Sequence, residues 1–292
     1  MSMHFITIIV LIVLNASAWA SEISEIVAGN AEKEAKPLVT PLVTADTILA
    51  VTKVVTPNVD TCGYANLGTV FERVIGLGHW CLTKGQINKY FAPELHLMKT
   101  KKGHADLFDW MYMHDYSKLA IALEHRLEDF FERKDLYTQA EKGKDVYNRT
   151  YNMTWNHLFD HNLGTCDNSE GKIGTLTEEK LDLLLPAIKI KINYLKDKFI
   201  AAKRYKTLYI ISHPRTGPDL ATLIKVRDSL TIIRDGDKNF CLLFLTPVKT
   251  YEGKENIIVH EAKNLSREWH GADTQRWKQI LDEFKFTSDI WQ

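Results

Sequence analysis

The chain has 292 residues, of which 45% are hydrophobic and 25% are charged, and its 37 Lys and Arg residues equal its 37 Asp and Glu residues. These values are typical of a globular protein that is large enough to bury a full core. The balanced charge offers no basic surface to nucleic acid, so we expect no nucleic-acid partner.

The N-terminus predicts entry into the secretory pathway. The apolar run Phe5 to Leu14 is too short for a transmembrane helix, and Ala18 and Ala20 place small residues where a signal peptidase reads. We expect residues 1–20 to be a signal peptide cleaved before Ser21, so that the chain is secreted or lumenal. An uncleaved anchor, which would tie the chain to a membrane, is the alternative. Three sequons suit a lumenal chain, at Asn148, Asn152 and Asn264.

Residues 21–60 show no helical or strand period that would bury a face, and they carry the near-repeat Pro-Leu-Val-Thr at Pro37 and Pro41. This pattern is typical of a flexible arm or stalk. We expect residues 61–292 to form a single α/β domain.

Cys81 is the first candidate for chemistry. It follows the apolar run Val70 to Leu77 and the turn Gly78-His79-Trp80, and it precedes a predicted helix from Leu82 to Phe91. A thiol at such a junction feels the positive end of the helix dipole, which lowers its pKa and favours the nucleophilic thiolate. The alternative is a small buried side chain under the turn. The turn lacks the third glycine of a dinucleotide-binding loop, so we expect no cofactor.

Two amphipathic helices follow, with apolar residues at three- and four-residue steps from Leu119 to Phe131 and from Ile188 to Ala202. Thr175 with Glu178 forms a capping box near the start of the second helix, and Pro186 predicts a kink or a restart there. Between the helices, His157 and His161 have the spacing of a metal pair. No third ligand is fixed by the sequence, so we expect no metal.

From Lys206 onward, strands alternate with helices. The pattern predicts strands at Thr207–Ser212, Phe240–Thr246 and Asn256–Ala262, and helices at Asp219–Ser229 and Asp273–Phe286. This alternation favours a mainly parallel sheet flanked by helices. Ligands of such sheets bind at the carboxyl ends of the strands, where His213 and Arg215 are expected beside the Cys81 turn. Arg215 is an anion-binding candidate there, or an ordinary surface residue.

Four cysteines in an oxidising compartment are expected to pair. Cys241 lies in a core-strand pattern, while Cys62 and Cys166 lie in predicted loops, so we expect a Cys62–Cys166 disulfide that leaves Cys81 and Cys241 as thiols. A bridge from Cys81 to Cys241 or to Cys62 would end the nucleophile hypothesis.

The order of motifs resembles a family of unknown function that is grouped with papain-like cysteine peptidases. The motifs are Gly76-Leu77-Gly78-His79-Trp80-Cys81, Leu107-Phe108-Asp109-Trp110 and Trp155-Asn156-His157-Leu158-Phe159, within a likeness from about Val70 to Phe284. The resemblance implies a catalytic pair of Cys81 and His157, with Asp109 as the acid that orients the imidazole. It also implies a papain-like α+β fold, in which an antiparallel sheet carries the histidine, as the alternative to the parallel sheet.

Three hypotheses for function remain. The first is a cysteine-dependent hydrolase or acyltransferase that acts on an amide or thioester in a small-molecule or peptide substrate. Its substrate-binding residues would be His79, Trp80, Trp110, His213 and Arg215. The second is a lumenal transferase, for instance of sugars, in which Arg215 holds a phosphorylated donor. The third is a non-catalytic binding protein.

Overall fold

The protein is described here by a computed structural model, which covers residues 70–78, 80–91, 106–109, 111–139, 145–155, 176–214, 217–263 and 273–288. Internal contacts divide the chain between Val59 and Asp60, and all of these residues belong to the second unit. The predicted signal peptide and arm lie outside them. Within the described ranges, no helix is long and apolar enough to cross a membrane.

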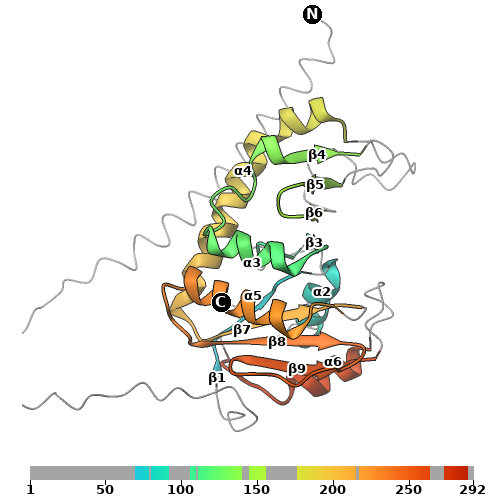
Figure 1. Cartoon of the computed structure of the whole chain (residues 1–292), viewed down its shortest axis with the longest axis vertical. Helices are drawn as coiled ribbons and strands as arrows, with labels where there is room; N and C mark the ends of the chain where they lie inside the picture. The colour runs from blue at the N-terminus through green and yellow to red at the C-terminus, as the bar shows by residue number, and fades with distance from the viewer. Residues whose placement is uncertain are drawn as a thin grey trace, which may run out of the picture. The chain divides into compact units, whose positions relative to one another are not determined.

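The centre of this unit is a parallel sheet of four strands in the order β2, β7, β8, β9 (Figure 1). The strands are β2 (Arg73–Gly76), β7 (Thr207–Ser212), β8 (Phe240–Thr246) and β9 (Ile257–Glu261). The residues of β7 and β8 are all buried, as expected for central strands of a parallel sheet that is covered on both faces. The predicted bounds of β7 and β8 are confirmed, and β9 is one residue shorter at each end than predicted.

Helices cover both faces of the parallel sheet. One face packs against α2 (Trp80–Phe91) and α6 (Thr274–Leu281), in a cluster that contains Val74, Leu208 and Cys241. The other face packs against α3 (Tyr116–Glu124), α4 (Glu178–Ala201) and α5 (Leu220–Ile233). Successive strand residues point to opposite faces, so each strand supplies both clusters in turn. The predicted class, a parallel sheet flanked by helices, is therefore the observed one.

A second sheet of four antiparallel strands was not predicted. Its order is β3 (Met111–Met113), β6 (Met153–Trp155), β5 (Val146–Asn148) and β4 (Leu136–Thr138). Each strand has only three residues, which is too short for a period-two pattern to show in the sequence. The chain thus contains an antiparallel sheet, the element that the papain-like resemblance implies, beside the parallel one. A further short pair joins β1 (Val70–Phe71) to β10 (Lys285–Phe286) in parallel.

Several predicted helix ends are wrong. The helix expected to reach Phe131 stops at Glu124, because the backbone turns through positive φ at Arg126 and Leu127. Phe130 and Phe131 are nevertheless buried, with their rings 5.6 and 5.0 Å from the ring of Trp155. Their apolar spacing therefore results from burial in a turn and not from a place on a helical face.

The other helices differ from the prediction as well: α2 begins at Trp80 instead of Leu82, and α5 continues to Ile233 instead of Ser229. The N-cap of α4 is Thr177, whose hydroxyl accepts a hydrogen bond from the Lys180 amide, whereas Thr175 lies outside the described residues. Pro186 sits inside α4, which continues past it without a break. The closing helix α6 ends at Leu281, and Phe286 belongs to β10 instead.

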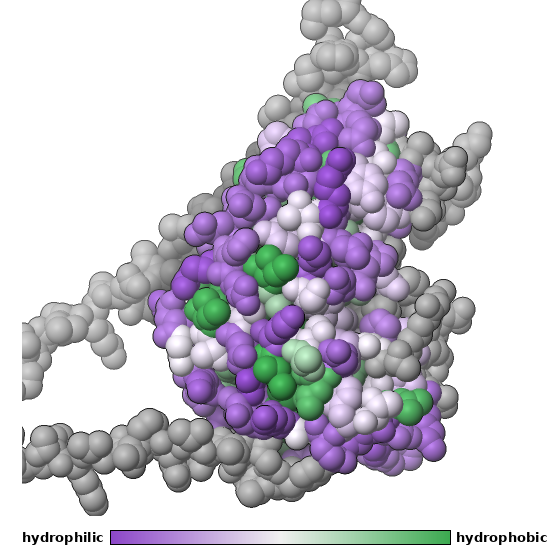
Figure 2. All heavy atoms as spheres, in the orientation of Figure 1, coloured by the Kyte–Doolittle hydropathy of each residue, from purple (hydrophilic) through white to green (hydrophobic). Residues whose placement is uncertain are grey.

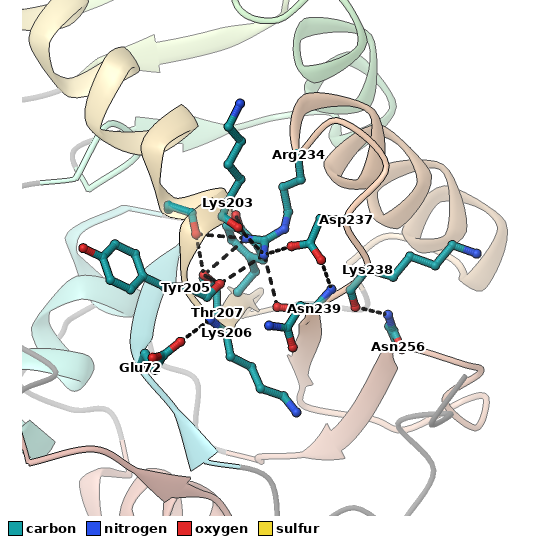
Figure 3. A network of polar contacts seen from close by, with 12 residues as sticks. Glu72, Lys203, Tyr205, Lys206, Thr207, Arg234, Asp237, Lys238, Asn239 and Asn256 are labelled. Carbon is teal, nitrogen blue, oxygen red and sulfur yellow. Dashed lines mark hydrogen bonds and ion pairs between the residues drawn. The ribbon is translucent and has the colours of Figure 1, made fainter. Parts of the chain in front are cut away.

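The amino-terminal end of the parallel sheet is held by the buried side chain of Arg234 (Figure 3). Its guanidinium donates hydrogen bonds to Thr207, Tyr209 and Asp237 and to four backbone carbonyls, those of Ala202, Lys203, Tyr205 and Asn239. These groups come from the end of α4, the start of β7 and the segment before β8. Arg234 thus fixes the sheet at the end opposite to the candidate site.

Candidate functional site at the carboxyl ends of β2 and β7

The segment before Cys81 leaves the sheet directly into α2. The Leu77 amide donates to the carbonyl of Ile210 at 2.8 Å, which extends the β2 to β7 ladder by one residue. Gly78 then adopts a φ of +88°, a conformation that glycine reaches without a steric penalty. Cys81 is the second residue of α2, and no residue of the first turn is acidic. The first amides of a helix have no partner within the helix, so the helix dipole there favours an anion such as a thiolate.

Thr83 ties the first turn of α2 to the end of β7. Its hydroxyl donates to the Gly78 carbonyl at 2.8 Å, and it lies 2.6 Å from the hydroxyl of Ser212, the last residue of β7. Because Thr83 uses its proton on Gly78, Ser212 is the donor in the second bond. Both side chains are buried. The carboxyl ends of β2 and β7 and the start of α2 therefore form one fixed junction.

His213 follows Ser212 at this junction. Its amide donates to the Leu245 carbonyl at 3.1 Å, and its half-buried ring makes an edge contact with the ring of Tyr116, with centroids 6.4 Å apart. The Tyr116 hydroxyl is buried and has no hydrogen-bond partner within the described part of the chain. Burial raises the pKa of Tyr116 well above its ordinary value, so this hydroxyl stays protonated. The structure thus places the predicted residue His213 at the same strand ends as Cys81.

Below the junction, α2 carries a buried charge cluster that includes the predicted residue Asp109. The Lys84 ammonium lies 3.2 Å from an Asp106 oxygen and 3.1 Å from Asp109 Oδ2. Asp106 also pairs with Arg73 at 3.2 Å and with Lys198 at 3.7 Å. Asp109 Oδ2 accepts a further hydrogen bond from the Asp106 amide at 2.6 Å. Lys84 lies three residues after Cys81, so this cluster fixes the Asp109 turn to the same helix.

The two carboxylates of the cluster titrate differently. Burial disfavours the charge on Asp106, but Lys84, Lys198 and Arg73 outweigh it and hold the pKa of Asp106 below its ordinary value. Burial raises the pKa of Asp109 to about 6, because Lys84 offsets only part of the desolvation and the Asp106 charge adds to it. Burial also disfavours the charge on Lys84, yet the two carboxylates raise its pKa above the ordinary value.

None of the contacts of this cluster described above uses the second carboxylate oxygen of Asp109. Asp109 Oδ1 is buried and has no hydrogen-bond partner among the described residues. Nearly all buried polar atoms in folded proteins are paired, and an unpaired one needs a reason. An oxygen of this kind is a ready acceptor for a donor such as an imidazole N–H.

Many of the predicted site residues lie outside the described residues. These are His79, Trp110, His157 and Arg215, and the side chains of Trp80 and Cys81 are also outside. His161, which has the spacing of a metal pair with His157, lies outside as well. The anion-binding role of Arg215, on which the sugar-donor hypothesis depends, therefore stays a prediction. Among the residues that the structure does describe, no group of three or more His, Cys, Asp or Glu could hold a metal ion.

The prediction that Cys241 is a free thiol is wrong, because Cys241 takes part in a disulfide. The register pairs Ser212 with Leu245, so Thr83 and the start of α2 lie beside Leu245. Cys241 precedes Leu245 by four residues, about 13 Å along an extended strand, whereas bridged cysteines have Cα atoms within roughly 7 Å. This separation argues against Cys81 as its partner. Cys62 and Cys166 lie outside the described residues. The chain has only four cysteines, so with Cys81 set aside one of these two has to be the partner of Cys241, and the predicted Cys62–Cys166 disulfide is then wrong.

Two of the predicted glycosylation sites have very different surroundings. The Asn148 side chain is buried, donates to the Phe130 carbonyl at 3.1 Å and accepts from the Tyr151 amide at 2.8 Å. A glycan on its amide nitrogen is incompatible with this fold, so the sequon there is structural. Asn152 is exposed and leaves room for a sugar. Asn264 lies outside the described residues.

No family model, no curated protein and no solved structure matches this chain. The site therefore has to be interpreted from its own residues. Four buried polar residues of the site were not predicted from the sequence, namely Thr83, Ser212, Lys84 and Asp106. One signal was present, since Asp106 and Asp109 flank two apolar residues and so had to find buried cations.

Proposed function

We propose that this chain is a cysteine-dependent hydrolase or acyltransferase that attacks the acyl carbon of an amide or thioester with Cys81. The observation that carries the proposal is the position of Cys81 in the first turn of α2, directly after the carboxyl end of β2. The Thr83 to Ser212 hydrogen bond fixes this turn against the end of β7. Strand ends of a parallel sheet are the usual place for ligands, and a helix start favours a thiolate.

Chain connectivity supports His157 as the base and Asp109 as its orienting acid. Trp155 pairs with Met111 in the register of β6 and β3. His157 follows Trp155 by two residues and Asp109 precedes Met111 by two, and a two-residue step spans at most about 7 Å. The proposal therefore assigns both residues to the end of this strand pair where Met111 faces Trp155. Lys84 joins Asp109 to α2 there, and Asp109 Oδ1 offers the acceptor that an imidazole N–H needs.

The proposed reaction uses these groups in two steps. The imidazole removes the thiol proton, the sulfur bonds to the acyl carbon, and the amine or thiol leaves with the proton returned by the imidazolium. Water or a second nucleophile then gives its proton to the imidazole and attacks the enzyme thioester, and the carbon–sulfur bond breaks to release the Cys81 thiolate. In this proposal the first backbone amides of α2 would bind the oxyanion of each tetrahedral intermediate. His213, and by the same proposal His79, Trp80, Trp110 and Arg215, would contact the substrate.

The test is the pH dependence of alkylation at Cys81. The full chain is treated with iodoacetamide across a pH series, and the Cys81 peptide is quantified by mass spectrometry. We expect a thiol pKa below about 7, against roughly 8.5 for an unperturbed cysteine. Asp109→Asn should slow the reaction near neutral pH, because the imidazole then loses the carboxylate that orients it. Asp219→Asn, which changes an exposed helix cap on α5, is the control and should leave the rate unchanged.

Two results would overturn the proposal. One is a Cys81 thiol with an ordinary pKa whose rate does not respond to Asp109→Asn. The other is a peptide map without reductant in which Cys81 is disulfide-bonded.

A further inference from the structure

The long helix α4 carries a second stripe on the side away from its core face. The core face consists of buried apolar residues, Leu181, Leu185, Ile188, Ile192, Leu195 and Phe199. The second stripe consists of exposed residues at steps of three and four, Lys180, Leu183, Ala187, Ile190, Tyr194 and Asp197. Alternating steps of this kind place all six in one line, the pattern of a two-helix seam. In Figure 1, α4 runs along the side of the strands β4 and β5.

The middle of this seam is apolar to an unusual degree for a surface helix. Leu183 is 61% exposed, Ile190 is 60% exposed and Tyr194 is 48% exposed. Single exposed apolar residues are common, and Figure 2 shows scattered green ones on the mostly hydrophilic face that it draws. Three in register on one helix form a stripe that another helix can cover. Burying this stripe removes apolar area from water, which favours association.

The charges at the two ends of the seam indicate which helix covers it. We propose that α4 pairs with α4 of a second copy of this chain in antiparallel orientation. Facing positions in such a pair have residue numbers with a constant sum, and one register places Leu183 on Tyr194 and Ala187 on Ile190 of the other copy. The same register places Lys180 on Asp197 of the other copy. Two-fold symmetry repeats each contact, so one Lys180–Asp197 ion pair lies at each end of the apolar centre.

The opposite orientation is disfavoured by the same residues. A parallel pair would face each residue with its own copy, so that Lys180 meets Lys180 and Asp197 meets Asp197. Like charges across a helix interface are repulsive, and they select against the wrong pairing. The small side chain of Ala187 also suits a larger neighbour such as Ile190. The seam is short, so we expect a dimer in the micromolar range rather than an obligate one.

A charge swap tests the proposal on the full-length chain. Sedimentation velocity over a series of concentrations gives the dimer dissociation constant for the wild type, Lys180→Glu, Asp197→Lys and the double variant. Each single variant should weaken the dimer by roughly tenfold or more, because it creates two like-charge contacts. The double variant restores both ion pairs with reversed sign, so its dissociation constant should return to within about threefold of the wild type.

An apolar pair of variants supplies the matched control. Ile190→Glu places a charge in the seam and should abolish the dimer, whereas Ile232→Glu on α5, at a residue 48% exposed, should leave it intact. Circular dichroism of each variant checks that the fold is kept. A wild type that is monomeric at every concentration overturns the proposal. So does a double variant that is no better than the single ones, because only the antiparallel pair predicts rescue.

Discussion

Replacing Arg234 with methionine should strongly destabilise the fold. The Arg234 side chain is 1% exposed, and its two terminal nitrogens serve seven acceptors at the amino end of the parallel sheet. Methionine keeps the aliphatic volume but satisfies none of these acceptors. Ala202 and Tyr209 are fully buried, so water cannot replace the lost donors without opening the core.

The magnitude follows from the partners left behind. Removing one side of a buried charged network typically costs 3–5 kcal/mol, so we expect a loss of about 4 kcal/mol in the free energy of unfolding. For a domain of this size such a loss lowers the melting temperature by about 10 °C. Arg234→Lys keeps the charge but offers only three donors, so its loss should be about half as large.

Urea denaturation followed by circular dichroism measures both variants. Arg227→Met is the matched control on the same helix, since the partners of Arg227 are carboxylates of Asp228 and Glu255 that are 57% and 55% exposed. That change should cost less than about 1 kcal/mol. If Arg234→Met proves no more destabilising than Arg227→Met, the structural role assigned to the network is refuted.

Three further predictions concern pH, glycosylation and the backbone at Gly217. Burial raises the pKa of Asp109 from 3.8 to about 6, so the folded state binds this proton more tightly than the unfolded state does. The contribution of Asp109 to stability therefore falls as the pH rises from about 4 to 6. Urea titrations give the difference in unfolding free energy between the wild type and Asp109→Asn. This difference should fall by up to about 3 kcal/mol over the same pH range. A constant difference would contradict the raised pKa of Asp109. When the chain is made through a eukaryotic secretory pathway, its intact mass should show a glycan that is lost in Asn152→Gln. Asn148→Gln should leave the glycan mass unchanged and lower the stability by about 1–3 kcal/mol. Gly217 has a φ of +66°, and an added Cβ would lie 2.6 Å from a Phe244 ring carbon. In thermal melting, Gly217→Ala should therefore destabilise the fold by more than about 1 kcal/mol. An unchanged melting temperature would mean that the backbone there relaxes freely.

The sequence determined the parallel sheet because its signal is local. The strands Thr207–Ser212 and Phe240–Thr246 are uninterrupted apolar runs of strand length, and each residue of such a run is buried whichever face it points to. The helix after each strand is marked by its cap and by its apolar stripe, as at Asp219, whose side chain accepts from the Thr222 amide. The position of Cys81 at the start of α2 follows from the same kind of evidence.

Tertiary structure alone decided the contacts between distant segments. The four short antiparallel strands have no period to detect, and the Phe130 and Phe131 pattern, which predicts a helix, is buried in a turn by contact with Trp155. Burial of Asn148 depends on the Phe130 carbonyl 18 residues away, which no sequon could show. Likewise, Lys84 became part of the site only because folding brought Asp106 and Asp109 to it. Local patterns fix element type, whereas the partners of buried polar groups depend on the packing of the whole chain.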